Sequence, residues 1–140
     1  MTIPATPAEL YRHGLQLLLD KDIPAWVDLW HEDGVLEFPF APEGWPRRLD
    51  GKAAIGDYMR RYPDHIDLCD FPDVTIHQTI TPGTIVAEMR GVGRLVKTGS
   101  PFEMTYIAVV TVEDGLISSY RDYWNPIAVS RPGADFAGMH

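Results

Sequence analysis

The chain has one cysteine, no long apolar run and a shortage of basic residues. Because Cys69 stands alone, an internal disulfide and a cluster of metal-binding thiolates are both excluded. No run approaches the ~20 apolar residues that a membrane-spanning helix requires. There are 12 Lys and Arg against 20 Asp and Glu, which gives a formal net charge of −8 and no clustered basic surface. We therefore expect no membrane and no nucleic acid as partners.

Motifs for common cofactors are missing as well. The five His and the acids show no spacing typical of metal ligands, and the sequence has no glycine-rich phosphate loop and no nucleophile elbow. We expect neither a metal nor an organic cofactor. The N-terminus lacks the charged and then apolar order of a signal peptide, so a cytoplasmic location is the default expectation.

The order of periodic segments predicts one α+β domain over residues 1–140. Three helices are predicted, over residues 7–19, 23–30 and 51–62, with Thr6, Asp22 and Asp50 as their N-caps. Strands are predicted over residues 35–40, 74–78, 84–96, 102–112 and 116–124. Helices followed by an antiparallel meander indicate a sheet that curls around helices and leaves a cavity between the two layers.

Residues 113–125 carry the strongest functional signal. Glu113-Asp114-Gly115 predicts a hairpin turn, and the strand after it mixes ionisable and aromatic residues as far as Asn125. A strand that only fills a core would carry Val and Ile, whereas an apolar pocket needs a few converging polar groups. The alternative is a half-exposed edge strand whose charges face water.

Asp122 is the first candidate for a catalytic acid or base. Strand alternation places Tyr120, Asp122 and Trp124 on one face and Arg121 and Tyr123 on the other. An Asp between two aromatic residues would be partly desolvated, which raises its pKa toward the range useful for proton transfer. The alternative is an ion pair between Asp122 and an arginine on a neighbouring strand.

Two glutamates are further catalytic candidates. Glu88 lies in an apolar run with Arg90 two positions on along the same face, so a solvated Glu–Arg pair is the competing interpretation. Glu37, which is flanked by Leu36 and Phe38, has the same two interpretations.

Aromatic residues predict the wall of a cavity for a flat, cyclic, largely apolar ligand. The candidate lining set is Tyr120, Trp124, Tyr106, Phe38, Trp30, Trp45 and Tyr58. Most aromatic residues at such spacings belong to a plain core. Trp45 differs because it lies in a loop between two prolines, which predicts a lid over the mouth.

Five strings in the right order resemble the nuclear-transport-factor-2-like superfamily, in particular its SnoaL-like branch. They are Leu29-Trp30-His31-Glu32-Asp33-Gly34-Val35, Leu49-Asp50-Gly51-Lys52-Ala53-Ala54-Ile55, Phe71-Pro72-Asp73-Val74, Val86-Ala87-Glu88, and Val112-Glu113-Asp114-Gly115-Leu116-Ile117 followed by Tyr120-Arg121-Asp122-Tyr123. The branch includes polyketide cyclases, ketosteroid isomerases, limonene epoxide hydrolase and small phenazine-biosynthesis proteins. The resemblance implies a cone-shaped, strongly curved, mostly antiparallel sheet around three N-terminal helices. It also implies a homodimer through the sheet, which we expect to involve residues 84–124.

The resemblance does not fix a reaction, because the superfamily includes enzymes and plain binders. Phe38 stands where ketosteroid isomerases have a catalytic Asp, and Gly14 and Ala108 fall near their oxyanion-hole positions. The isomerase machinery is therefore not matched. The Arg and two Asp of limonene epoxide hydrolase are not matched either.

The phenazine-type proteins give the closest local match. Arg121-Asp122-Tyr123 reproduces their Arg-Glu-aromatic string with a shorter acid. His65 falls near the place where these relatives present a His to their ligand, which makes it a candidate for substrate binding.

We expect a cofactor-independent cyclase, isomerase or dehydratase that acts on a small cyclic metabolite by acid–base catalysis. Two alternatives remain open from the sequence. One is a non-catalytic ligand-binding or scaffold domain with the same cavity. The other is a subunit that only pairs with another protein through its sheet.

Overall fold

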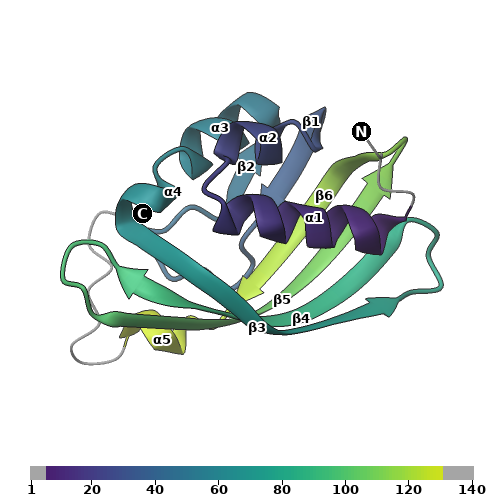
Figure 1. Ribbon diagram of the computed structural model, residues 1–140. Helices are drawn as coiled ribbons and strands as arrows, with labels where there is room; N and C mark the ends of the chain where they lie inside the picture. Colours follow the sequence, from purple (N-terminus) through teal and green to yellow (C-terminus); the bar gives the residue numbers. More distant parts are fainter. Residues whose placement is uncertain (1–5, 131–140) are drawn as a thin grey trace.

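The computed structural model describes residues 6–130, in which helices cover one face of a curved six-stranded sheet (Figure 1). The elements are α1 (Pro7–Leu19), α2 (Ile23–Val27), β1 (Trp30–Glu37), β2 (Arg48–Asp50), α3 (Lys52–Met59), α4 (Tyr62–His65), β3 (Ile66–Gln78), β4 (Thr84–Leu95), β5 (Pro101–Glu113), β6 (Leu116–Trp124) and α5 (Ile127–Ser130). The strand order is β2-β1-β6-β5-β4-β3, and β1 and β6 form the only parallel pair between these strands. The predicted α+β fold, with a curved and mostly antiparallel sheet around three helices, is confirmed.

The first two helices begin where the sequence predicts. The Thr6 side chain accepts a hydrogen bond from the Glu9 amide at 3.1 Å, and Asp22 accepts one from the Ala25 amide at 3.2 Å. Each cap satisfies an amide that has no partner inside its helix. The second helix ends at Val27, earlier than predicted, because Trp30 already pairs with Ile117 in the sheet.

The prediction for the third helix was wrong in its cap and in its length. Asp50 belongs to β2, where it pairs with Val35, and Gly51 with a φ of 93° is the N-cap of α3. Helix α3 ends at Met59, and Pro63 lies in the first turn of the separate short helix α4. Proline fits the first turn of a helix but not its interior, so Pro63 lies at the start of a new helix. The apolar spacing up to residue 62 therefore predicted a third helix that was too long.

Strand β3 is much longer than predicted, because bulges hide its first half in the sequence. The register against β4 shifts between Leu68 and Asp70 and again between Asp70 and Asp73. A bulge breaks the alternation of side chains and bends its strand. These shifts help to curl the end of the sheet around the helices.

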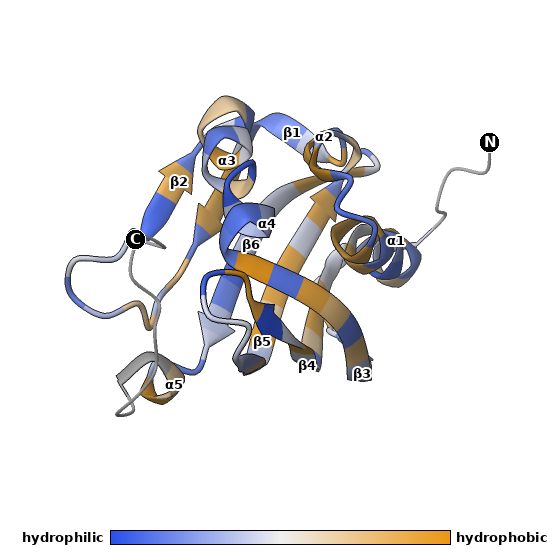
Figure 2. Ribbon diagram, turned by 60° about the vertical axis from the view of Figure 1, so that its left-hand side comes forward, coloured by the Kyte–Doolittle hydropathy of each residue, from blue (hydrophilic) through white to orange (hydrophobic). Residues whose placement is uncertain are grey.

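The concave face of the sheet and the inner sides of the helices form the core. Hydrophobic residues alternate with hydrophilic ones along the strands (Figure 2). In β4, Ile85, Ala87 and Met89 are buried, and in β5, Ala108 and Val110 are fully buried. Within residues 6–130, no helix has the length and apolar character needed to cross a membrane.

We expect Gly93→Ala to lower the free energy of unfolding by about 2–3 kcal/mol. A Cβ at this position in β4 would lie 2.1 Å from the Asp67 carbonyl oxygen and 2.9 Å from the Leu68 Cα, and backbone atoms cannot move away cheaply. The matched control is Gly56→Ala in α3, whose Cβ would meet Val27 at 3.6 Å, an ordinary contact. Alanine also favours a helix over glycine, so this variant should be as stable as the parent or more so. Urea unfolding curves measure both, and equal stabilities would contradict the close approach of β3 and β4.

Candidate active site

A cavity of about 120 Å³ lies between the helices and the concave face of the sheet. Its wall consists of aliphatic, sulfur-containing and aromatic side chains, together with one acid. The lining residues are Leu15, Leu18, Trp26, Leu36, Phe38, Trp45, Tyr58, Met59, Tyr62, Ile66, Leu68, Phe71, Met89, Phe102, Met104, Tyr106, Tyr120, Asp122 and Trp124. An apolar cavity with a few polar groups is the usual form of a small-molecule site.

Strand β6 places Asp122 on the inner face of the sheet. Asp122 pairs with Ala108 across the β5–β6 ladder, and Ala108 pairs with Ala87 across the β4–β5 ladder. Because side chains alternate along a strand, these three lie in one row on the concave side. The two alanines are fully buried and small, which leaves room above the sheet for the carboxyl group.

Asp122 is half-buried, and one oxygen of its carboxyl group is both shielded from solvent and unpaired. Its Oδ1 is inaccessible to solvent and has no hydrogen-bond partner within residues 6–130. An arginine on a neighbouring strand, which the sequence left open, therefore does not hold this oxygen. Burial penalises the charged form and raises the pKa of Asp122 to about 7. At neutral pH the group is present in both protonation states.

Five tyrosines surround this acid. Burial is the main cause that raises the pKa of each phenol, and the negative charge of Asp122 raises each pKa further. They are Tyr11, Tyr58, Tyr62, Tyr106 and Tyr120. At neutral pH all five keep their hydrogen, so they act as neutral hydrogen-bond donors.

Aromatic pairs form the rest of the wall. Trp45, from the loop between β1 and β2, lies with its ring centroid 5.3 Å from that of Trp124. Phe38 and Tyr58 form a second pair at 5.7 Å. The structure thus brings Tyr120, Trp124 and the candidates Tyr106, Phe38, Trp45 and Tyr58 together around Asp122.

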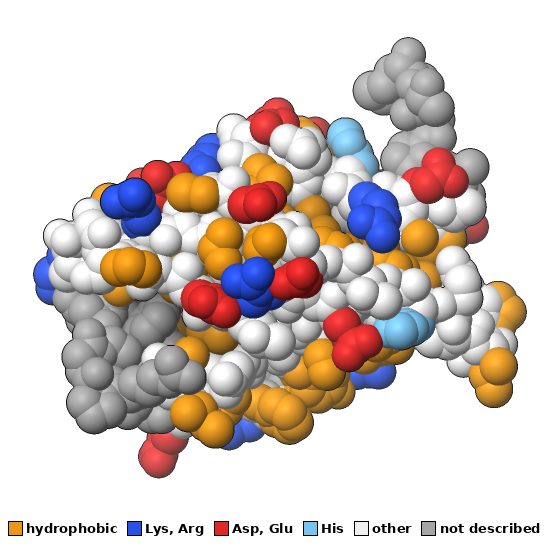
Figure 3. Space-filling view, turned by 60° about the horizontal axis from the view of Figure 1, so that its bottom comes forward, with side chains coloured by type: hydrophobic (Ala, Val, Ile, Leu, Met, Phe, Trp, Pro, Cys, Tyr) orange, Lys and Arg blue, Asp and Glu red, His pale blue; other side chains and the backbone are white. Residues whose placement is uncertain are grey.

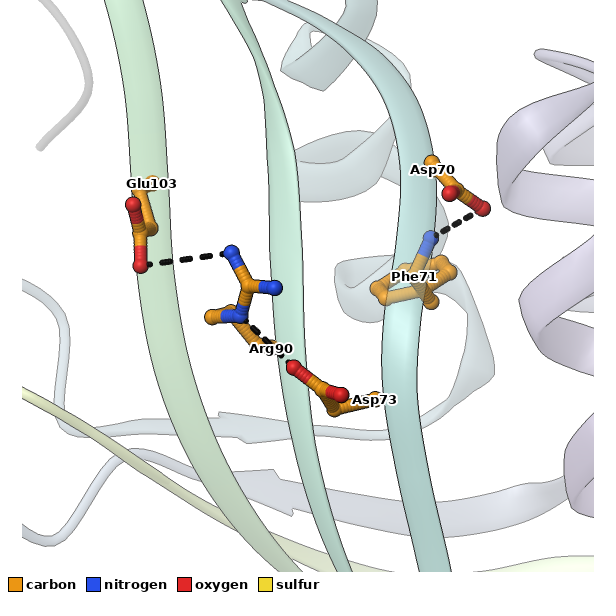
Figure 4. A network of polar contacts seen from close by, with 5 residues as sticks. All are labelled: Asp70, Phe71, Asp73, Arg90 and Glu103. Carbon is orange, nitrogen blue, oxygen red and sulfur yellow. Dashed lines mark hydrogen bonds and ion pairs between the residues drawn. The ribbon is translucent and has the colours of Figure 1, made fainter.

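Glu88 does not lie in the cavity, and both interpretations of it were wrong. Its side chain is 57% exposed on the outer face of the sheet, and its Oε2 lies 2.6 Å from Nε2 of His77. Arg90 instead contacts Asp73 at 2.8 Å and Glu103 at 3.5 Å (Figure 4). Figure 3 shows this outer face, where acidic, basic and apolar side chains lie next to one another. Glu88 is on this face because Ala87 and Met89 point inward.

Three other candidates also lie outside the cavity lining. Glu37 is half-buried at the end of β1, 3.9 Å from the Arg48 guanidinium. Trp30 is fully buried in the core, and His65 is the last residue of α4. The aromatic ring of Trp30 stacks on Tyr120 at 5.9 Å, so it supports the wall from behind.

Tyr11 and Tyr62 were not predicted from the sequence as polar groups near the cavity. Both lie in segments that the sequence predicts as helices, over residues 7–19 and 51–62. A hydroxyl in an otherwise aliphatic stripe was the available signal, because a buried phenol needs a hydrogen-bond partner. The Tyr11 hydroxyl finds Tyr120 at 3.0 Å and the Met89 sulfur at 3.1 Å.

A curved sheet around three helices, with a cavity between the two layers, is the nuclear-transport-factor-2-like fold, which is shared by solved structures described as a candidate polyketide cyclase and a candidate isomerase. The SnoaL-like domain family matches residues 11–120, and the chain belongs to this family.

Three known proteins illustrate the similarity. YesE, an uncharacterized protein from Bacillus subtilis (strain 168), is 44% identical over 121 residues, which are 86% of this chain and 82% of YesE. The crystal structure of a candidate isomerase from Bacillus subtilis is 40% identical with a TM-score of 0.88, and the match covers 97% of this chain and 99% of that one. A Mycobacterium tuberculosis protein in complex with estradiol-17β-hemisuccinate is 22% identical with a TM-score of 0.69, and covers 86% and 95% of the two chains. The last likeness is one of fold alone.

We expect Asp122→Asn to stabilise the protein at high pH and not at low pH. The pKa of Asp122 is about 7 in the folded state against an ordinary value of 3.8, so between these values the folded state binds more protons than the unfolded state. The free energy of unfolding of the parent therefore falls as the pH rises from about 4 to about 7, by on the order of 4 kcal/mol from this group. Asn carries no charge, so the difference between variant and parent should grow over this range. Urea unfolding at pH 4, 6 and 8 measures it, and a constant difference would mean that Asp122 is not buried.

Proposed function

We propose that the protein is a cofactor-independent enzyme, a cyclase, isomerase or dehydratase, in which Asp122 transfers a proton on a cyclic and largely apolar ligand. The observation that carries this proposal is the Asp122 carboxyl group, which lines an aromatic cavity and has one oxygen that is shielded from solvent and unpaired. A carboxyl placed only for stability would have a partner, since an unpaired buried polar group is costly.

The chemistry of the site suits a proton transfer within one ligand. With a pKa of about 7, Asp122 is a usable base as the carboxylate and a usable acid as the carboxylic acid. It accepts a proton from a carbon next to a carbonyl group and returns it to another atom of the same ligand, so no proton is consumed. Cyclisations, isomerisations and dehydrations of carbonyl compounds share the first of these steps.

The cavity suits a small ring system. Cavities of roughly 150 Å³ with aliphatic and aromatic walls hold benzene, and the cavity here has about 120 Å³ with two aromatic pairs in its wall. The Mycobacterium tuberculosis protein of the same fold was solved in complex with estradiol-17β-hemisuccinate, which supports the proposal of a flat cyclic ligand.

A non-catalytic ligand-binding domain is the second candidate function. One observation favours it: among the lining residues of the described chain, Asp122 is the only one with a carboxyl group, and no histidine accompanies it. A binder would use the acid only to orient a polar atom of its ligand.

Exchange of carbon-bound hydrogen separates the two functions without a known substrate. The probe is 1-indanone, a flat bicyclic ketone, whose C2 protons exchange with D2O and are followed by NMR. We expect the protein to accelerate this exchange, with a rate that rises as the pH rises through about 7, since the carboxylate is the base. Asp122→Asn should lower the catalysed rate by about 10²–10⁴-fold, while the affinity for the ketone changes little.

The control is Glu88→Gln, which removes an acid from the outer face and should leave the exchange rate unchanged. An Asp122→Asn variant with unchanged exchange would contradict the catalytic role. A parent protein that binds 1-indanone without exchanging its C2 protons would favour the binder.

We also propose that two copies of the chain pair through the outer face of the sheet. Ile107 is 42% exposed in the centre of β5, next to Tyr123 of β6, and Phe40 packs edge-on against Tyr123 at 5.1 Å. Charges of both signs lie on the same face, with Glu88 opposite Ile107 and Arg90 between Asp73 and Glu103, so an acid of one copy can face Arg90 of the other. The partner is a second copy of this chain.

Light scattering tests the pairing. We expect the parent to have the mass of a dimer at micromolar concentration, and Ile107→Glu to shift it toward the monomer, because a buried unpaired charge is costly. A matched change in an exposed turn, Ile80→Glu, should leave the mass unchanged. A parent with the mass of a monomer would overturn this proposal.

A further inference from the structure

The hydroxyl groups of Tyr11 and Tyr120 share a limited number of hydrogens. Tyr11 extends from α1, Tyr120 from β6, and their oxygens are 3.0 Å apart, so that either one can donate. Tyr11 also reaches the sulfur of Met89 at 3.1 Å, and there Tyr11 is the donor. Each phenol has one hydroxyl hydrogen, so Tyr11 can donate a hydrogen bond to Tyr120 or to Met89, but not to both at once.

Two arrangements of these hydrogens follow. In the first, Tyr120 donates to Tyr11 and Tyr11 donates to Met89, so both hydroxyl hydrogens have an acceptor within the protein. In the second, Tyr11 donates to Tyr120, and the hydrogen of Tyr120 needs another acceptor. Tyr120 and Met89 both line the cavity, whereas Tyr11 lies behind them. The acceptor in the second arrangement is therefore an atom inside the cavity.

The surroundings allow a change between the two arrangements. A thioether is a weak acceptor, so little is lost when Tyr11 leaves Met89. Burial keeps the pKa of both phenols above the usual value, so neither one becomes an anion that would lock the direction. The ring of Tyr120 is held in place by the stacked ring of Trp30, so only the hydrogens need to move.

We propose that Tyr11 and Tyr120 form a donor relay. In the free protein Tyr120 donates to Tyr11 and Tyr11 donates to Met89. When a ligand is bound, Tyr11 donates to Tyr120 and Tyr120 donates to the carbonyl oxygen of the ligand. Tyr120 binds the ligand, and Tyr11 and Met89 are positioning residues. The relay selects neutral carbonyl compounds over hydrocarbons of the same shape. Anions are disfavoured, because Asp122 shares the cavity and the described lining has no Lys or Arg. The proposal rests on the proposed function only in that the ligand occupies the same cavity.

A matched pair of probes tests the relay. 1-Indanone and indane have the same ring system and differ by one carbonyl oxygen. The two readouts are the ratio of their dissociation constants, measured by quenching of tryptophan fluorescence, and the infrared carbonyl band of bound 1-indanone labelled with ¹³C. A hydrogen bond lowers the frequency of this band, and a purely structural role for the tyrosines would not affect it.

Tyr120→Phe should reduce the preference for 1-indanone by about fivefold and move the carbonyl band toward its value in an apolar solvent. Met89→Leu should act in the opposite direction and increase the preference by about threefold, because Tyr11 then has Tyr120 as its acceptor. Indane reports any change of cavity shape in the same variant. The matched control is Tyr123→Phe on the same strand but the opposite face, which should alter neither readout.

A carbonyl band that is unchanged in Tyr120→Phe would overturn the proposal. A band and a preference that are unchanged in Met89→Leu would overturn the part played by Met89. Asp122→Asn separates this inference from the proposed function: it should lower the rate of catalysed exchange by about 10²–10⁴-fold but keep the shifted band. If the shifted band depends on Tyr120 while the parent catalyses no exchange, the relay stands and the catalytic proposal fails.

Discussion

The rest of this structure is arranged around one unpaired carboxyl oxygen that is shielded from solvent, Oδ1 of Asp122. Asp122 Oδ1 has no hydrogen-bond partner within residues 6–130, and isolation of this kind is unfavourable for the charged form. The curved sheet and the helices that cover it shield this oxygen from solvent. The bulges of β3 bend the sheet, and the small side chains of Ala87 and Ala108 leave room for the carboxyl group.

The same constraint explains why the polar groups around the acid are phenols. A lysine or an arginine at this position would pair with Asp122 and lower its pKa again, so the group would no longer titrate near neutral pH. A phenol offers a hydrogen without a charge, and burial above all, with the charge of Asp122 as a smaller cause, raises the pKa of Tyr106 and Tyr120 so that the hydrogen stays in place. The cavity thus combines one group that titrates near neutral pH with several neutral phenols that form hydrogen bonds. This combination fits the proposed function, in which a neutral carbonyl ligand would acquire negative charge on its oxygen.

Local signals in the sequence predicted the parts of the fold that depend on neighbouring residues. The Thr6 and Asp22 caps, the turn at Asp114-Gly115 and the alternation along β6 depend on a few adjacent residues each. The placement of Asp122 among aromatic residues followed from the alternation alone. Features that depend on distant segments were lost, such as the early end of α2, where Trp30 joins the sheet, and the bulged half of β3.

Glu88 shows the limit most clearly. Its strand was predicted, but which face of β4 points inward depends on the curvature of the sheet and the position of the helices. The sequence of residues 85–89 does not show which face of β4 is buried, because apolar residues lie on both faces. Val86 is on the outer face, and Ile85 and Ala87 are on the inner one. The chain alone left Glu88 with two interpretations, and the pairing with His77 across β3 and β4 was neither of them.

The central claim is that Asp122 is an unpaired acid that titrates near neutral pH. The most direct test follows the ¹³C chemical shift of its carboxyl carbon by NMR between pH 3 and pH 9, with the signal assigned by its loss in Asp122→Asn. The account predicts a single transition with a pKa of about 7. A transition at the ordinary pKa of about 4 would show a solvated or ion-paired carboxylate and would contradict the account.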